Sequence, residues 1–176
     1  MTLPSPRMLN LAGLLACIGA MLAVLYLQHY QGLEPCPLCV FQRVGVIVAG
    51  LFFFVALLHN PGTVGQRIYA LLAGCGVIGG GFVAARHVWL QNLPAEEVPA
   101  CGPGLDYMLD VFPMQDVLNM VLHGSGECAD IDWVLLGISL PGWSLIMFVG
   151  LGALVALQLI RTFGASTPGS QPNALS

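Results

Sequence analysis

Charged residues are scarce in this 176-residue chain, and lysine is absent altogether. Only 8% of the residues are charged and 57% are hydrophobic, whereas about a quarter of the residues are charged in a typical soluble domain. A soluble domain of this length could not cover its surface with so few polar side chains. The composition therefore excludes a soluble globular protein and indicates an integral membrane protein.

The in-and-out alternation of a membrane β-barrel is also missing, because the apolar runs are continuous. Four such runs lie at about 8–27, 40–58, 68–90 and 143–160, and each is long enough to cross ~30 Å of hydrocarbon as a helix. The first run is longer than the apolar core of a signal peptide, and no small-residue cleavage site follows it. We expect it to be retained, so the sequence predicts an all-α bundle of four transmembrane helices.

The chain shows no internal repeat and no linker between domains. We therefore predict a single four-helix membrane domain over residues 1–163. The remaining residues, 164–176, are mainly serine, proline, glycine and other small or polar residues, with one asparagine, a composition typical of disorder. They are expected to form a disordered cytoplasmic tail.

Five arginines carry the whole basic signal, and three of them lie between or beyond the apolar runs. Arg7, Arg67 and Arg161 occupy the N-terminal end, the middle connection and the C-terminal end, so the positive-inside rule makes these three segments cytoplasmic. The other two connections, about 28–39 and 91–142, hold all nine acidic residues and no arginine. We predict that both termini are cytoplasmic and that these two loops face outward.

The two remaining arginines, Arg43 and Arg86, fall inside apolar runs near their outward ends. An arginine at membrane depth costs a few kcal/mol and is a candidate for function. It can also be a residue whose side chain reaches the lipid headgroups from a helix end. Both interpretations stand for Arg86, whereas the neighbours of Arg43 favour a functional role.

The six cysteines divide by location. Two of them, Cys17 and Cys75, are in the middle of apolar runs, where cysteine behaves as a small hydrophobic packing residue. The other four lie in the outward loops, and an even number in an oxidising compartment indicates two disulfides. The short loop holds one pair and the long loop the other: Cys36 with Cys39, and Cys101 with Cys128.

The short pair is suited to redox exchange. Cys36 and Cys39 lie where the second run begins, and Pro37 fits the first position of a helix. A helix N-terminus favours the thiolate form of cysteine. A bridge that closes only two intervening residues removes little chain entropy and is a poor structural staple. This pattern predicts a redox-active disulfide.

Arg43 and His87 are the candidate partners of this pair. Arg43 follows Cys39 by four residues, one turn along the same helix face. Its cation could support a thiolate, or it could hydrogen-bond the oxygen of a quinone at the membrane boundary. His87 approaches the same depth from the third run and could donate to that oxygen. An ordinary interfacial histidine is the alternative for His87.

The long loop between Cys101 and Cys128 contains a predicted short helix. Pro113 can start it and Gly124 can end it. Apolar residues recur at helical spacing in this stretch, as expected for an amphipathic helix lying on the membrane surface. The Cys101–Cys128 disulfide could be a structural bridge that stabilises a long loop, or it could be redox-active. Both interpretations stand.

The chain resembles the disulfide bond formation protein B (DsbB) family. The resemblance rests on four spans, an outward Cys-x-x-Cys that opens the second span, an arginine four residues on, and a second cysteine pair in the last outward loop. It covers nearly the whole chain, through the Trp133 to Gly137 stretch and the Leu140 to Trp143 start of the fourth span.

This resemblance implies a protein-disulfide:quinone oxidoreductase of the bacterial inner membrane, with both cysteine loops periplasmic. A reduced DsbA-like thiol oxidase would attack Cys101, and the Cys101–Cys128 bridge would then re-form by passing electrons to Cys36 and Cys39. Cys39 would meet the quinone, ubiquinone or menaquinone, at a site that includes Arg43 and His87. DsbA is a strong oxidant at about −120 mV, so its reoxidation needs a more oxidising acceptor such as a quinone.

Three other kinds of protein or site share part of this pattern. A tetraspanin-like organising protein also has four spans and structural loop disulfides, but has no use for a Cys-x-x-Cys at a helix start. An enzyme similar to vitamin K epoxide reductase shares the four-helix plan, but places its active cysteines near the last helix. A zinc site built from the four loop cysteines does not suit an oxidising compartment, so we expect no metal. We also expect no nucleic-acid partner.

Overall fold

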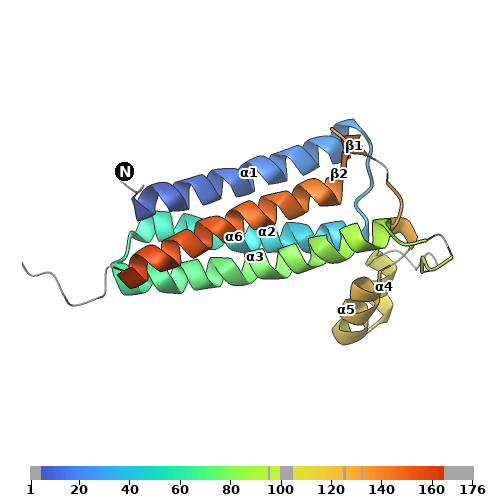
Figure 1. Ribbon diagram of the computed structural model, residues 1–176. Helices are drawn as coiled ribbons and strands as arrows, with labels where there is room; N and C mark the ends of the chain where they lie inside the picture. The colour runs from blue at the N-terminus through green and yellow to red at the C-terminus, as the bar shows by residue number, and fades with distance from the viewer. Residues whose placement is uncertain (1–4, 95, 100–104, 125, 132, 165–176) are drawn as a thin grey trace, which may run out of the picture.

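Four long helices form the body of the protein. The computed structural model describes residues 5–94, 96–99, 105–124, 126–131 and 133–164. Within them lie α1 (Pro6–Tyr30), α2 (Pro37–His59), α3 (Thr63–Gln91) and α6 (Leu140–Gly164), and all four are long and apolar enough to cross a membrane. Each contains one of the apolar runs and extends beyond it at both ends. The predicted all-α four-helix membrane fold is therefore confirmed (Figure 1).

Two predicted features lie outside the described residues. These are Cys101, a predicted catalytic residue, and the tail over 165–176. The described part of the predicted tail is Gly164, which is the last residue of α6.

The helix ends follow from local sequence. Ser5 caps α1, and its hydroxyl accepts a hydrogen bond from the Met8 amide at 3.4 Å. The second helix begins at Pro37, as predicted, with Cys36 as its N-cap residue. It ends at His59, and the C-cap residue Asn60 adopts a left-handed conformation with φ of 40°. A connection of three residues, 60–62, leads directly into α3.

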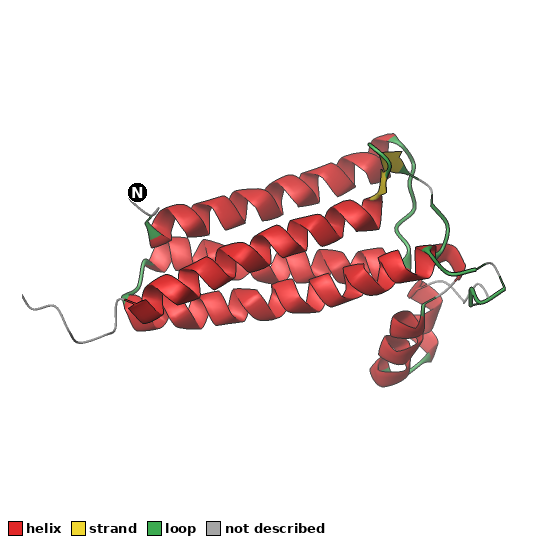
Figure 2. Cartoon of the chain, in the orientation of Figure 1, coloured by secondary structure: helices red, strands yellow, loops and turns green. Residues whose placement is uncertain are grey.

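The four helices form a ring in which α2 packs between α1 and α3, and α6 packs against α3 and α1. The start of α1, the α2–α3 connection and the end of α6 share one end of the bundle, here called the far end (Figure 1). The short helices, the strands and most of the loops gather at the opposite end, here called the loop end (Figure 2). This arrangement is the one required if the three arginine-bearing segments share one side of a membrane.

Glycines allow α2 and α3 to pack closely, as the small-residue spacing predicts. A Cβ atom on Gly76 would lie 2.9 Å from the Ala49 amide nitrogen and 3.0 Å from the Gly45 carbonyl oxygen. A Cβ atom on Gly80 would overlap the ring of Phe148 on α6. Three of the four helices therefore meet at this glycine face of α3.

Gly80→Ala is expected to destabilise the bundle by about 1–3 kcal/mol, because the added methyl group must displace the Phe148 ring. Gly79→Ala is the matched control, since a Cβ atom there meets nothing within 4 Å. The measurement is the free energy of unfolding in mixed detergent micelles titrated with a denaturing detergent. Equal stability of the two variants would show that the ring moves aside without cost.

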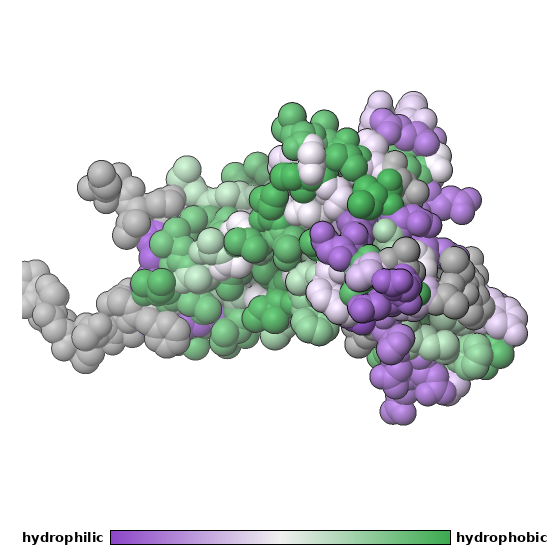
Figure 3. Space-filling view, turned by 45° about the vertical axis from the view of Figure 1, so that its right-hand side comes forward, coloured by the Kyte–Doolittle hydropathy of each residue, from purple (hydrophilic) through white to green (hydrophobic). Residues whose placement is uncertain are grey.

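The outer surface of the bundle is apolar. Exposed hydrophobic residues recur at helical spacing, for example Ile47, Leu51, Phe54 and Leu58 on α2, as expected for contact with lipid. In Figure 3 the helical body is mainly hydrophobic, and hydrophilic residues gather at the loop end. Of the two mid-span cysteines, Cys17 is buried in the core, whereas Cys75 is exposed on α3. Only Cys17 therefore packs inside the bundle.

At the far end, three buried amide side chains link three helices. Asn10 of α1 donates to Gln66 of α3 at 3.0 Å and accepts from Gln158 of α6 at 3.0 Å. All three side chains are buried. Water cannot reach their amide groups, so these hydrogen bonds supply the partners that the groups need. No pattern in the sequence predicts this network.

The loop end carries a helical pair and a hairpin. The helices are α4 (Leu105–Val111) and α5 (Met114–His123), and a 3₁₀ turn over Gly126–Cys128 follows them. The strands β1 (Val134–Leu135) and β2 (Ile138–Ser139) pair antiparallel. The predicted bounds of α5 are confirmed, whereas α4 and the hairpin were not predicted.

The apolar face of α5 divides between two environments. Val117 and Val121 are buried in a cluster with Leu38 and Leu90 at the ends of α2 and α3. Met114 is exposed. The prediction that this whole face lies on the membrane surface is therefore too simple, because part of it docks the helix onto the bundle.

Candidate active site

Cys36 and Cys39 lie at the first turn of α2. Cys36 is the N-cap residue, and the intervening Leu38 is fully buried and anchors the turn. The two sulfur atoms are 3.1 Å apart, within hydrogen-bond reach but longer than a covalent S–S bond of about 2.05 Å. A small movement of either side chain would therefore close a disulfide between the two sulfurs.

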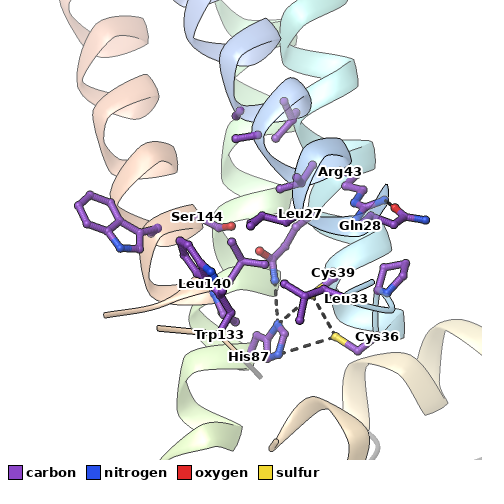
Figure 4. Close-up of a pocket in the computed structure, with 18 of the residues that line it drawn as sticks. Leu27, Gln28, Leu33, Cys36, Cys39, Arg43, His87, Trp133, Leu140 and Ser144 are labelled. Atoms are coloured by element: carbon purple, nitrogen blue, oxygen red, sulfur yellow. Dashed lines mark hydrogen bonds between the residues drawn. The ribbon is translucent and has the colours of Figure 1, made fainter. Parts of the chain in front are cut away.

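His87 of α3 faces this pair. Its Nε2 is 3.8 Å from the Cys36 sulfur, and its Nδ1 is 3.9 Å from the Cys39 sulfur, as Figure 4 shows. The buried side chain of Gln42 directs its amide nitrogen to Nδ1 at 3.1 Å. With Gln42 donating, Nδ1 accepts and Nε2 carries the proton that faces Cys36.

Cys128 approaches Cys36 from the long loop. It ends the 3₁₀ turn and is 1% exposed. Its sulfur, the Cys36 sulfur and a ring nitrogen of His87 all lie within 4.8 Å of one another. One cysteine of each predicted pair is thus within a short movement of the other. The same three atoms are ligand types that zinc accepts.

Arg43 lies one turn further along α2, beside a cavity of about 460 Å³ that Cys39 and His87 also line. Its guanidinium donates to Gln28 of α1 at 2.6 Å, and Figure 4 shows the two side chains together. The remaining wall is largely apolar, with contributions from Leu27, Val46, Met147 and Phe148. The cavity therefore joins an apolar interior to a few convergent polar groups, as small-molecule sites do.

Most of the predicted site residues meet in one place. The lining of the cavity includes Cys36, Cys39, Arg43 and His87. Cys128 is not one of the lining residues, but its sulfur lies within 4.8 Å of the Cys36 sulfur. Arg86 instead contacts α5 and Trp89.

Sequence reasoning missed Gln28 and Gln42. Each is an uncharged amide near the loop end of a span. The available signal was the rarity of polar side chains at membrane depth, which marks them as candidates for function.

Comparison with known proteins gives a consistent result. Residues 6–158 match the family described as disulfide bond formation protein DsbB. The chain is 51% identical over 158 residues to disulfide bond formation protein B of Methylococcus capsulatus, which covers 90% of this chain and 96% of that relative. It is 53% identical over 150 residues to the protein of the same name from Acinetobacter baumannii, covering 85% and 88% respectively.

These matches extend over all four long helices and the loops between them. They support a disulfide oxidoreductase and do not favour the structural four-span alternative. The chain belongs to the DsbB family of membrane disulfide bond formation proteins.

Proposed function

We propose that the protein reoxidises a reduced periplasmic thiol oxidase of the DsbA type and passes the electron pair through its two cysteine pairs to a membrane quinone. The position of Cys36 carries this proposal. Its sulfur lies 3.1 Å from that of Cys39 and within 4.8 Å of that of Cys128. Cys36 can therefore form a bond with either sulfur after a small movement.

The proposed exchange begins at the long loop. A thiolate of the reduced partner attacks Cys101 of the Cys101–Cys128 disulfide, and Cys128 leaves as a thiolate. The partner's second thiolate then displaces Cys101 and closes the partner's own disulfide. Two electrons have moved from the partner to the Cys101 and Cys128 pair, which is now reduced.

The second exchange regenerates the loop disulfide. Cys128 attacks Cys36 of the Cys36–Cys39 disulfide, forms a Cys36–Cys128 bond and releases Cys39 as a thiolate. Cys101 then attacks Cys128, which restores the loop bridge and leaves Cys36 reduced. The electron pair now resides on Cys36 and Cys39, next to the cavity.

Neighbouring groups can stabilise the thiolates that these steps release. Cys36 is the N-cap residue of α2, where the helix dipole favours negative charge. With Nδ1 accepting from Gln42, Nε2 of His87 can donate to the Cys36 sulfur. Both groups already face the Cys36 sulfur, so little rearrangement is needed when charge develops.

The cavity fits a quinone headgroup. Its volume of about 460 Å³ and its mainly apolar wall suit an uncharged ring. Arg43 and Gln28 supply hydrogen-bonding groups at one side, and His87 at another. A bound quinone would accept two electrons and two protons. Arg43 would hold it by donating to a ring oxygen.

The proposed location is the bacterial inner membrane, with the loop end in the periplasm. Two arginines at the far end support this orientation. Arg7 lies in the first turn of α1, and Arg67 of α3 donates to the backbone carbonyl of Thr162 near the end of α6. Cytoplasmic loops and ends carry the excess of positive charge in membrane proteins.

The test is quinone reduction by the purified protein in detergent, supplied with a reduced DsbA-type dithiol protein and followed by quinone absorbance. Wild type is expected to turn over, and the Cys36→Ser/Cys39→Ser variant is expected to be inactive. Cys75→Ser is the matched control, because this cysteine is exposed on α3 and is not one of the residues that line the cavity. No turnover by a folded wild-type protein with either ubiquinone or menaquinone analogues would refute the proposal.

A further inference from the structure

We propose that Arg86 and Gln91 are positioning residues that hold the Cys128 segment on α3, so that Cys128 is the stationary member of its pair. The Cys128 segment is here the Gly126–Cys128 turn with its flanking residues His123, Gly124 and Asp130. This inference rests on the proposed function, because it assigns how the internal exchange step is arranged. The sequence left Arg86 without a role, and its position in the structure supplies one. Three contacts along α3 carry the argument.

The first contact precedes Cys128 in the chain. Arg86 donates from Nη2 to the carbonyl oxygen of His123, the last residue of α5, at 3.1 Å. The last carbonyls of a helix lack partners within the helix and carry partial negative charge, so a guanidinium suits them well. The guanidinium carbon also lies 4.1 Å from the centre of the Trp89 ring, a cation–π contact that orients it. Figure 1 shows α5 beside the loop end of α3.

The second contact is a close passage of the backbone over α3. Gly124 has φ of +89°, and a Cβ atom there would overlap the fully buried side chain of Leu90. Only glycine combines this conformation with so close an approach. The chain then enters the 3₁₀ turn over Gly126–Cys128, closed by a 2.9 Å bond from the Ala129 amide to the Gly126 carbonyl. The segment therefore lies against α3 just before it presents Cys128.

The third contact follows Cys128. Gln91 donates from Nε2 to the carbonyl oxygen of Asp130 at 3.3 Å. Its Oε1 accepts from the hydroxyl of Ser139 on β2 at 2.7 Å. The amide thus joins the segment to α3 and to the hairpin, and the Cys128 segment is attached on both sides of the reactive residue.

These contacts share one face of α3 with His87. Arg86 and Leu90 are four residues apart, as are His87 and Gln91, so the four side chains form two adjacent rows on the helix. A single rigid helix therefore sets the position of Cys128 relative to His87. Because Cys128 is held near Cys36, its effective concentration for exchange is raised. Cys101 is then the member that reaches the soluble partner.

The experiment measures this effective concentration directly. In a Cys39→Ser/Cys101→Ser protein, the cysteines that remain in the loops are Cys36 and Cys128. Glutathione redox buffers then give the equilibrium constant for the Cys36–Cys128 disulfide. Adding Arg86→Ala is expected to lower that constant about tenfold, as for loss of one hydrogen bond from a charged donor. Arg86→Lys, which keeps a cationic donor, should restore most of it.

Gln91→Ala should lower the same constant by several-fold, through loss of the bond after Cys128. Arg67→Ala is the matched control, because Arg67 also donates to a backbone carbonyl from α3, but at the far end. It should leave the constant unchanged. The inference is overturned if Arg86→Ala stays within twofold of the parent, or if Arg67→Ala lowers the constant equally. Should Arg86→Ala fail to fold, Arg86→Gln and Gln91→Ala carry the same test.

Neither quinone nor partner protein enters this equilibrium, so the two proposals fail separately. A parent protein that shows the Arg86 effect but never reduces quinone would refute the proposed function and leave the positioning role intact. Quinone turnover without an effect of Arg86→Ala would support the proposed function and refute the positioning role.

Discussion

Replacing Cys39 with serine is expected to stop quinone reduction, with turnover at least about 10³-fold below wild type, as for loss of an essential nucleophile. Cys39 is the pair partner of Cys36 and lines the cavity. Without it, the sulfur that remains within reach of Cys36 among the described residues is that of Cys128. The relay should therefore halt with the electrons unable to leave the protein.

The variant should also show where it halts. The Cys36 thiolate is expected to attack Cys128 of the Cys101–Cys128 disulfide, forming a Cys36–Cys128 bond and releasing Cys101 as a thiol. Alkylation followed by peptide mass spectrometry without reduction identifies both products. Cys75→Ser serves again as the control that should keep full turnover. A trapped bond between Cys36 and Cys101 would contradict the proposed order of exchange.

The four spans could be predicted because the membrane imposes a simple rule. A helix that crosses hydrocarbon needs about twenty apolar residues, and each of the four runs met that length. The helix ends were harder to place, since α3 begins at Thr63 and α6 at Leu140, before the apolar runs start. Polar residues and glycine precede the apolar run in α3, and Pro141 and Gly142 precede it in α6, so composition does not mark these starts.

The loop end was only partly predictable. Pro113 and Gly124 mark the limits of α5 in the sequence, and the structure has the helix at Met114–His123. The two-residue strands have no comparable pattern, because their turn depends on positive φ at both Leu136 and Gly137. Leucine is a rare choice for that conformation. Leu136 followed by Gly137 is therefore only a weak local signal for this turn.

The site shows the same division between local and tertiary information. The spacing of Cys36, Cys39 and Arg43 fixes their order along one helix turn, and the sequence alone conveys it. The contact of His87 with both sulfurs depends on how α3 packs against α2, which no spacing encodes. Gln28 is harder still, since its bond to Arg43 depends on the rotation of α1.

A distinct result is expected for Arg43, whose proposed task is to hold the quinone. Arg43→Ala should lower quinone reduction by about 10²-fold, the usual loss when a donor to a developing negative charge is removed. Exchange between the two cysteine pairs should change little, because His87 and the start of α2 still face the Cys36 sulfur. Arg43→Lys should recover part of the loss, since it keeps the charge but not the planar fork.

Two separate measurements distinguish these roles. Steady-state quinone absorbance gives the turnover and the KM for quinone. Quenched-flow alkylation without quinone follows electron transfer from the loop pair to the Cys36 and Cys39 pair. Gln28→Leu tests the neighbouring contribution, because it removes the acceptor that meets the guanidinium at 2.6 Å and leaves the charge in place. If Arg43→Ala slowed both reactions equally, Arg43 would act on the cysteines rather than on the quinone, and the cavity would lose its main proposed anchor.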